Sequence, residues 1–117
     1  MKPIIVLATV SSLEDARRIA RAVVERKLAA CAQLSTIESF YTWKGTLEHQ
    51  PEVRILFKTT DAAYDALERA IEELHPYEVP AIHATPIDRI FEPYMRWIVE
   101  NTEAPQGYPG TGAPADT

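Results

Sequence analysis

Residues 37–60 read IESFYTWKGTLEHQPEVRILFKTT, and this stretch decides the fold expected of the 117-residue chain. Its first seven residues are mostly aromatic, β-branched or small, and its second half alternates apolar with charged side chains, as half-buried strands do. Lys44-Gly45 is a turn signal between the two halves. We therefore expect strands over 37–43 and 46–60 that form one long hairpin arm. Pro51 has no N–H to donate, so it is expected at a bulge or at an unpaired edge position.

Two further elements precede this arm. Residues 3–9 form a continuous apolar run rich in β-branched residues, which indicates a strand that is buried on both faces. Ser11 and Glu14 have the spacing of a capping box, in which each side chain satisfies a free backbone N–H of the other residue. Apolar residues at helical spacing then predict a helix over residues 12–27.

After the arm, the pattern changes back to a helical one. Asp61 is expected to cap a second amphipathic helix over residues 62–74, which His75-Pro76 ends. An extended linker then leads to a last strand over 81–90. A short helix is expected at about 92–101.

The predicted order βαββαβ, followed by the short helix, is that of a ferredoxin-like α+β sandwich. We expect one such domain over residues 1–102, with two helices on one face of an antiparallel sheet. The other face then lacks a cover, and the arm is long for so small a domain, so both features indicate self-association. Residues 103–117 contain three of the nine prolines and three of the four glycines, and this tail is expected to be disordered.

Composition and charge narrow the classes of function. The net charge is −5 and Lys and Arg form no run, which argues against nucleic-acid binding. No apolar stretch approaches the roughly 20 residues of a membrane span. The single cysteine, Cys31, cannot form an intramolecular disulfide, which favours the cytoplasm.

Motifs of catalysis are missing from the sequence. No serine lies in a G-x-S-x-G elbow, and Gly45 is the only glycine before residue 103, so no phosphate-binding loop is expected. No paired ligands at zinc-site spacing occur either. The sequence therefore indicates a non-enzymatic protein that requires no cofactor.

The segment from His75 to Pro80 offers a candidate metal site. His75 and Glu78 could bind a common cation from a loop that two prolines constrain. The alternative is structural, with the His75 side chain capping the last carbonyls of the preceding helix. The sequence leaves both interpretations open.

An aromatic set comprises Phe40, Tyr41, Trp43 and Tyr77. Tryptophan and tyrosine are enriched at subunit interfaces, but such a set also lines ligand clefts. A cleft between subunits would satisfy both interpretations.

Several short motifs resemble the CutA divalent-cation tolerance family over residues 3–101. They are, in order, Lys27-Leu28-Ala29-Ala30-Cys31, Tyr41-x-Trp43-x-Gly45, Glu52-Val53 running to Lys58-Thr59, His75-Pro76-Tyr77-x-x-Pro80, and Tyr94-x-x-Trp97. The resemblance implies a ferredoxin-like fold, a cytoplasmic homotrimer and an association with tolerance to copper and other divalent metals, with no reaction attached. It places Tyr41, Trp43, Glu52, Lys58 and Tyr77 at a subunit interface or cleft.

The resemblance also shapes what we expect of copper. The copper-binding members carry ligands at positions that here hold Ala8, Leu74 and Ala81, whose side chains cannot coordinate a metal. We therefore expect only weak copper binding, through His75 and Glu78. A second class of function to consider is that of a small-molecule signalling trimer resembling the nitrogen-regulatory PII-type proteins, which share this architecture. A third class is that of an enzyme.

Overall fold

Four strands and three α-helices form the fold of residues 1–103, the part of the chain that the computed structural model describes. The predicted order is confirmed, and apart from Glu103 the predicted disordered tail lies outside the described residues. The elements are β1 (Pro3–Val10), α1 (Leu13–Glu25), β2 (Cys31–Trp43), β3 (Thr46–Thr60), a 3-10 turn (Asp61–Ala63), α2 (Tyr64–Leu74), β4 (Ile82–Pro86) and α3 (Glu92–Glu100).

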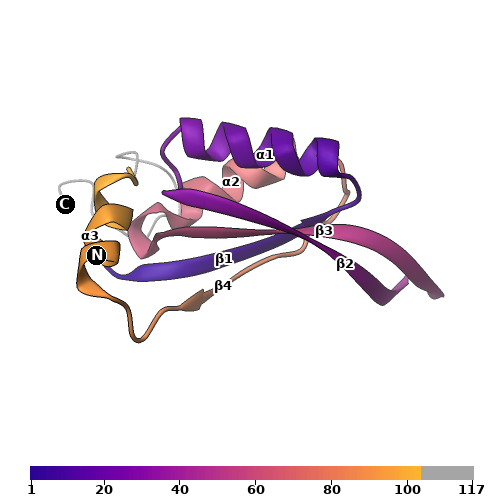
Figure 1. The fold of residues 1–117 in the computed structure, drawn as a ribbon. Helices are drawn as coiled ribbons and strands as arrows, with labels where there is room; N and C mark the ends of the chain where they lie inside the picture. Colours follow the sequence, from indigo (N-terminus) through magenta and orange to yellow (C-terminus); the bar gives the residue numbers. More distant parts are fainter. Residues whose placement is uncertain (104–117) are drawn as a thin grey trace.

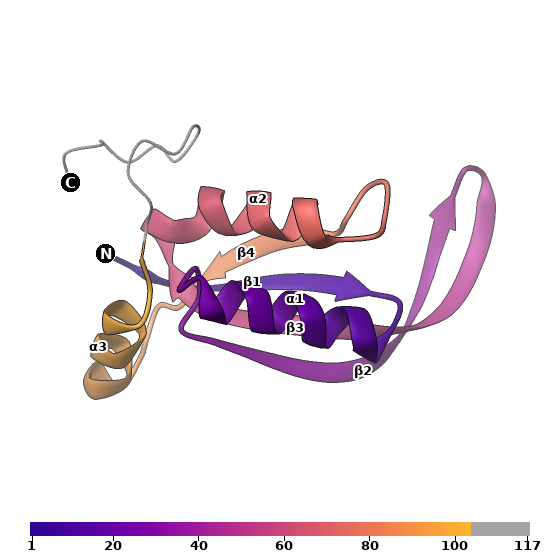
Figure 2. The same ribbon diagram turned by 90° about the horizontal axis from the view of Figure 1, so that it is seen from above.

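The strands form one antiparallel sheet in the order β2-β3-β1-β4, as expected for a ferredoxin-like fold. β2 and β3 pair in one register from Cys31 opposite Lys58 to Trp43 opposite Thr46. β1 ends at Val10, which lies opposite Val53 of β3. The outer half of the β2–β3 hairpin therefore projects beyond the sheet as the expected arm (Figures 1 and 2).

Pro51 lies on this arm, two residues beyond the last β3 residue that pairs with β1. It is opposite Glu38 of β2, and the register on either side of it does not shift. Pro51 therefore lies where β3 has β2 on one side and no β1 on the other, which makes it an edge position rather than a bulge.

The core lies between one face of the sheet and the helices α1 and α2, which cover that face side by side (Figures 1 and 2). Val6, Ile55 and Phe57 of the sheet are fully buried there against Ile19 of α1 and Leu67 of α2. Burying one such side chain contributes about 1.5–3 kcal/mol. The alternation in β3 and the helical spacing in α1 and α2 therefore determine this layer. The prediction that β1 is buried on both faces was wrong for the single chain, because only one face of β1 lies under the helices and the side chains on its other face are half-buried.

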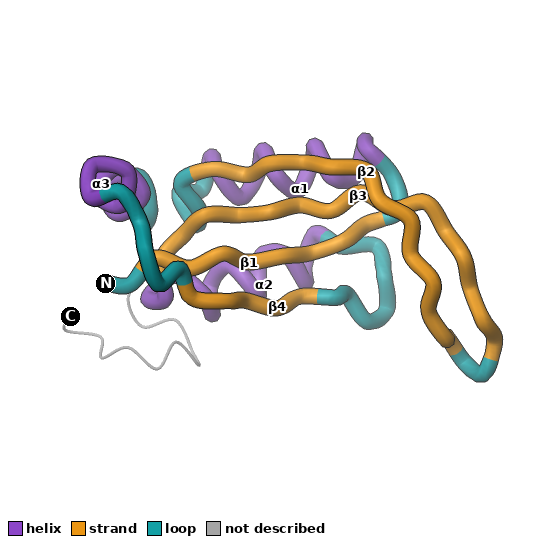
Figure 3. The backbone as a smooth tube through the Cα atoms, turned by 60° about the horizontal axis from the view of Figure 1, so that its bottom comes forward, coloured by secondary structure: helices purple, strands orange, loops and turns teal. Residues whose placement is uncertain are grey.

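The opposite face of the sheet, seen in Figure 3, is covered by no helix among the described residues. Ile5, Leu7 and Leu56 lie on it and are half-buried. α3 lies at the end of the sheet, where it contacts β3 and β1 and buries Ile98 completely. The expected open face is thus present in the single chain. No helix in the described part of the chain is long and apolar enough to cross a membrane.

Two predicted helix caps were wrong in detail. α1 is capped by Ser12, one residue after the predicted Ser11: its Oγ accepts the backbone N–H of Asp15 at 3.1 Å and donates to the Asp15 carboxylate at 3.2 Å. Asp61 does not cap α2 with its side chain, because its carboxylate accepts the backbone N–H of Lys2 at 3.0 Å. This contact ties the start of β1 to the end of β3.

The bounds of two strands also differ from the predictions. β2 begins at Cys31 rather than residue 37, because residues from Cys31 onward pair with the buried strand β3 although alanines and serines are weak strand formers. β4 ends at Pro86, four residues before the predicted end. Pro86 lies opposite Ile4, and one further bond, from the N–H of Ile87 to the carbonyl of Pro3 at 3.2 Å, brings the ladder to the residue at which β1 begins.

Candidate functional site

A cleft of about 810 Å³ lies between the arm and the loop that follows α2. Its walls are arm residues 38–41, Trp43 and Glu52, loop residues 77–79 and Ala81, together with Thr9 at the end of β1. The fold therefore brings Tyr77 to the same cavity as the arm aromatics, as a ligand cleft requires.

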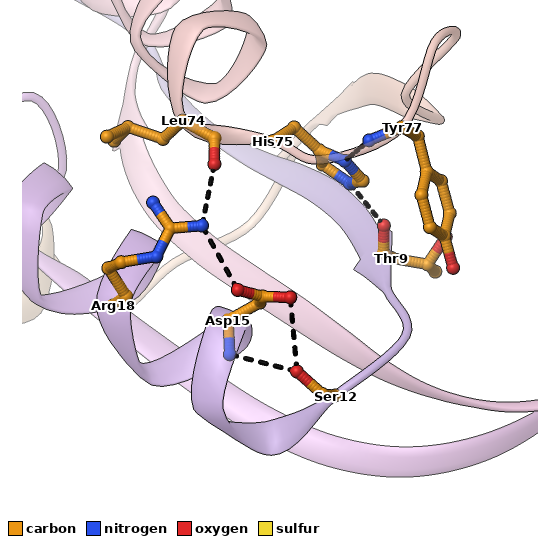
Figure 4. Close-up of polar contacts among 7 residues, drawn as sticks. All are labelled: Thr9, Ser12, Asp15, Arg18, Leu74, His75 and Tyr77. Atoms are coloured by element: carbon orange, nitrogen blue, oxygen red, sulfur yellow. Dashed lines mark hydrogen bonds and ion pairs between the residues drawn. The ribbon is translucent and has the colours of Figure 1, made fainter.

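His75 positions the loop that forms one side of the cleft. Its ring is buried, with Nε2 2.6 Å from the carbonyl oxygen of Thr9 and Nδ1 3.1 Å from the backbone nitrogen of Tyr77 (Figure 4). A carbonyl oxygen only accepts, so Nε2 carries the proton, and Nδ1 accepts the N–H of Tyr77. The neutral imidazole thus connects the end of β1 to the backbone of Tyr77.

The proposed capping role of the His75 side chain was wrong. The backbone N–H of His75 bonds to the carbonyl of Ile71, but the ring points to Thr9. The last carbonyl of α2, that of Leu74, instead accepts a hydrogen bond of 2.8 Å from the Arg18 guanidinium on α1 (Figure 4). Arg18 also pairs with Asp15 at 3.2 Å, so one side chain joins the start of α1 to the end of α2.

Tyr77 extends this chain of contacts to the arm. Its hydroxyl donates to the Glu52 carboxylate at 2.7 Å, and only 6% of Glu52 is exposed. Burial, and then the hydrogen bond and charge of Glu52, raise the pKa of Tyr77 to about 12 because they disfavour the phenolate. The phenol is therefore neutral at physiological pH and holds a buried carboxylate in the wall of the cleft.

The turn of the arm places a cation beside the same cleft. Lys44 and Gly45 both have positive φ values, 50° and 82°, as the two central residues of a type I′ hairpin turn do. The Lys44 ammonium lies 5.5 Å from the centre of the Trp43 ring and 3.7 Å from the Glu78 carboxylate. The arm tip and the loop after α2 are thus linked across the cleft.

The two predicted metal ligands do not lie together on a common empty position. Both ring nitrogens of His75 make hydrogen bonds within the chain, and the Glu78 carboxylate faces Lys44. Over residues 1–103, no three His, Cys, Asp or Glu side chains are grouped so that they could hold a metal ion. A metal at His75 would have to displace one of its present partners, and the site stays a prediction.

Of the five predicted interface or cleft residues, four line the cleft and Lys58 does not. The Lys58 ammonium donates to Gln33 at 3.0 Å and lies 5.5 Å from the centre of the Tyr94 ring, near α3. Sequence reasoning missed Thr9 and Glu38 as cleft residues. Neither carries a local signal, since each resembles an ordinary strand residue until the chain is folded.

Fold and cleft together define a small ferredoxin-like domain whose projecting arm forms one wall of an aromatic and acidic cavity. The chain belongs to the family described as CutA1 divalent ion tolerance protein, whose model matches residues 4–101. This family match confirms the resemblance drawn from the sequence motifs.

Individual relatives agree with this assignment. The divalent-cation tolerance protein CutA of Pyrococcus horikoshii is 37% identical over 86% of this chain and 98% of its own length. That of Thermus thermophilus is 43% identical over 84% of this chain and 96% of its own length. The solved structure of the periplasmic divalent cation tolerance protein CutA from Archaeoglobus fulgidus matches with a TM-score of 0.84 and 35% identity, over 86% of this chain and 99% of that one.

Proposed function

We propose that this protein is a non-enzymatic, homotrimeric CutA-type protein that takes part in tolerance to copper and other divalent cations. The observation that carries the proposal is the family match, which extends over residues 4–101 and so over nearly the whole described fold. The relatives that match over nearly their full length are named for divalent-cation tolerance.

Exposed apolar side chains on the arm support self-association. Phe40 is 66% exposed, Leu47 72% and Trp43 40%, and all three lie on a hairpin that packs on little of its own chain. The open sheet face adds half-buried aliphatic side chains at its centre. A second copy that covers either surface would remove apolar area from water, which is the main favourable term in association. The number three comes from the resemblance to the family.

The cleft is where we propose that a ligand or a metal ion acts. One wall belongs to the arm, so a neighbouring subunit that contacts the arm would also border the cavity. Copper binding is proposed to be weak and to involve His75 and Glu78, because imidazole suits copper but two donors select poorly. The protein is proposed to be cytoplasmic, since its single cysteine allows no intramolecular disulfide.

The ferredoxin-like architecture, with the strand order β2-β3-β1-β4, supports a second candidate function, that of a small-molecule signalling trimer resembling PII-type proteins. Thermal shift measurements with a panel of nucleotides and metal salts separate the two. A shift specific to nucleotides would favour the signalling function, whereas a shift with divalent metals would favour tolerance.

Native mass spectrometry of protein from cells tests the assembly, and growth of a host that lacks its own copy tests the role. We expect a trimer, and we expect the chain to restore growth at copper concentrations that inhibit the deletion strain. Trp43→Ala serves as a variant with a weakened interface, and Glu25→Gln, on the exposed side of α1, serves as its matched control. A monomer at micromolar concentration would refute the assembly, and unchanged copper sensitivity would refute the role.

A further inference from the structure

We propose that the cleft between the arm and the loop after α2 binds a small organic cation, with an ammonium or guanidinium head on an apolar body. This inference rests on the proposed function, in which the cleft is a ligand site, and it names the chemical class of that ligand. It depends on three features of the cavity: its charge, its aromatic faces and the position of Lys44.

The side chains that line the cleft carry negative charge only. Glu38, Glu52 and Glu78 contribute carboxylates, and no Lys, Arg or His is among the lining residues. Glu38 also contacts the ring of His49 at 2.9 Å, so its charge is partly offset when that ring is protonated. An anionic ligand such as a nucleotide phosphate would face these carboxylates at short range, so the cleft favours a cation.

Glu52 is the most buried of the three carboxylates that line the cleft. Only 6% of its surface is exposed, so it is 94% buried. Among the described residues, the phenol of Tyr77 is the only hydrogen-bond donor to its carboxylate. Buried carboxylates are normally paired with a cation, because a neutral donor replaces only part of the lost hydration. A cationic head placed against Glu52 would supply a charge opposite to that of its carboxylate.

The aromatic walls indicate what kind of cation fits. Phe40, Tyr41, Trp43 and Tyr77 all line the cavity. Aromatic faces attract cations through the ring quadrupole, and the attraction is strongest for weakly hydrated organic heads such as quaternary ammonium groups. A hard metal ion keeps its water or takes oxygen ligands, and it would gain little from these rings.

The chain already places one ammonium in this arrangement. Nζ of Lys44 lies between the Trp43 ring, at 5.5 Å from its centre, and the Glu78 carboxylate, at 3.7 Å. Both side chains of this ion pair are 70% exposed, so the pair is weak and Lys44 can be displaced. The rim of the cleft therefore accommodates an organic ammonium, and Lys44 competes with an external one.

The test compares choline with its neutral carbon isostere, 3,3-dimethyl-1-butanol, on the full chain in its native assembly. Binding is followed by the NMR signal of the Trp43 indole N–H and by calorimetry at low and high salt. We expect choline to shift this signal and saturate it, and the alcohol to bind at least about tenfold more weakly. Added salt should weaken choline binding, because the attraction is partly between charges.

Variants locate the site, because some should weaken choline binding whereas another should strengthen it. Glu52→Gln should weaken choline binding about tenfold, in line with the energy of a single charge contact. Lys44→Gln, which removes the internal competitor, should strengthen it about two- to threefold. If Glu52→Gln does not fold, Glu78→Gln at the exposed rim replaces it, with a loss of about threefold expected.

Equal binding of the two probes, or choline binding that Glu52→Gln and Glu78→Gln leave unchanged, would overturn the inference. So would a failure of choline to bind combined with cross-linking of Glu52 to a lysine of a second copy, since the cleft would then be an interface only. That last outcome would leave the trimer and the role in metal tolerance intact, because the mass spectrum and the growth assay test those separately.

Discussion

Replacing Tyr77 with Phe removes one hydroxyl and leaves its ring in place, so it isolates the contact between the loop after α2 and the arm. In the native chain this hydroxyl donates to Glu52 at 2.7 Å, and Glu52 is 94% buried, given its 6% exposure. Hydrogen bonds to charged groups contribute about 1.5–3 kcal/mol, and the variant would leave the carboxylate without its donor. Because Tyr77 itself is only half-buried and water can enter, we expect a loss of stability near the lower end, about 1.5 kcal/mol.

Guanidinium unfolding followed by circular dichroism, repeated over a range of protein concentrations, measures this loss. The concentration series separates it from a change in assembly, because only coupled dissociation makes the midpoint depend on protein concentration. The control is a double-mutant cycle with Glu52→Gln, whose amide no longer carries a buried charge. The two substitutions should couple by about 1 kcal/mol, since they remove the two partners of one contact. A Tyr77→Phe variant within about 0.5 kcal/mol of the parent, or full additivity in the cycle, would refute the reasoning.

Four further expectations concern single residues. Trp43→Ala should weaken the trimer by about 2 kcal/mol, measured as a higher dissociation midpoint on dilution, and an unchanged midpoint would argue against an interface role. The pKa of Tyr77 and that of Tyr64 are raised from 10.0 to about 12, each by burial first. Folding therefore favours the neutral phenols, and their contribution to stability is complete below pH 10 and lost as the pH rises through about 12. Ultraviolet titration of the folded protein should show two tyrosines that ionise later than the others. A titration without any late-ionising tyrosine would contradict this expectation. Calorimetry with copper should show one weak site per chain that His75→Ala abolishes, whereas a tight site at one metal per trimer would point to ligands shared between subunits. Phe57→Ala should cost about 3–5 kcal/mol by leaving a cavity beneath α1 and α2, and a smaller loss would mean that the core closes around it.

The arm and the order of the elements were predictable because their signals are local. Alternating side chains in residues 46–60 and the Lys44-Gly45 turn determine a hairpin, whatever the rest of the chain does. The bounds were less predictable where two neighbouring residues offer the same chemistry. Ser11 and Ser12 can each cap a helix, and the structure uses Ser12, which no local pattern distinguishes from its neighbour.

The candidate site was predictable only in part. The aromatic residues indicated a cleft or an interface. The role of His75, however, depends on its contact with Thr9, which is 66 residues away along the chain. The contact between Tyr77 and Glu52 spans 25 residues. Which of these distant residues come into contact is decided by the packing of α2 against the sheet. The local pattern of a single sequence does not show which residues that packing brings together.

The constant register of β2 on β3 limits how the reach of the arm can change. Each strand rises about 3.4 Å per residue, and neighbouring side chains point to opposite faces. Removing one pair next to the turn, such as Thr42 with Leu47, would shorten the arm by about 3.4 Å and turn the outermost pair, Trp43 and Thr46, to the other face. Removing two pairs would restore the face and draw the tip back by about 7 Å. The length of the arm can therefore change, with its tip residues kept on the same face, only by two residue pairs at a time. Any surface that the tip contacts must then accommodate a displacement of about 7 Å.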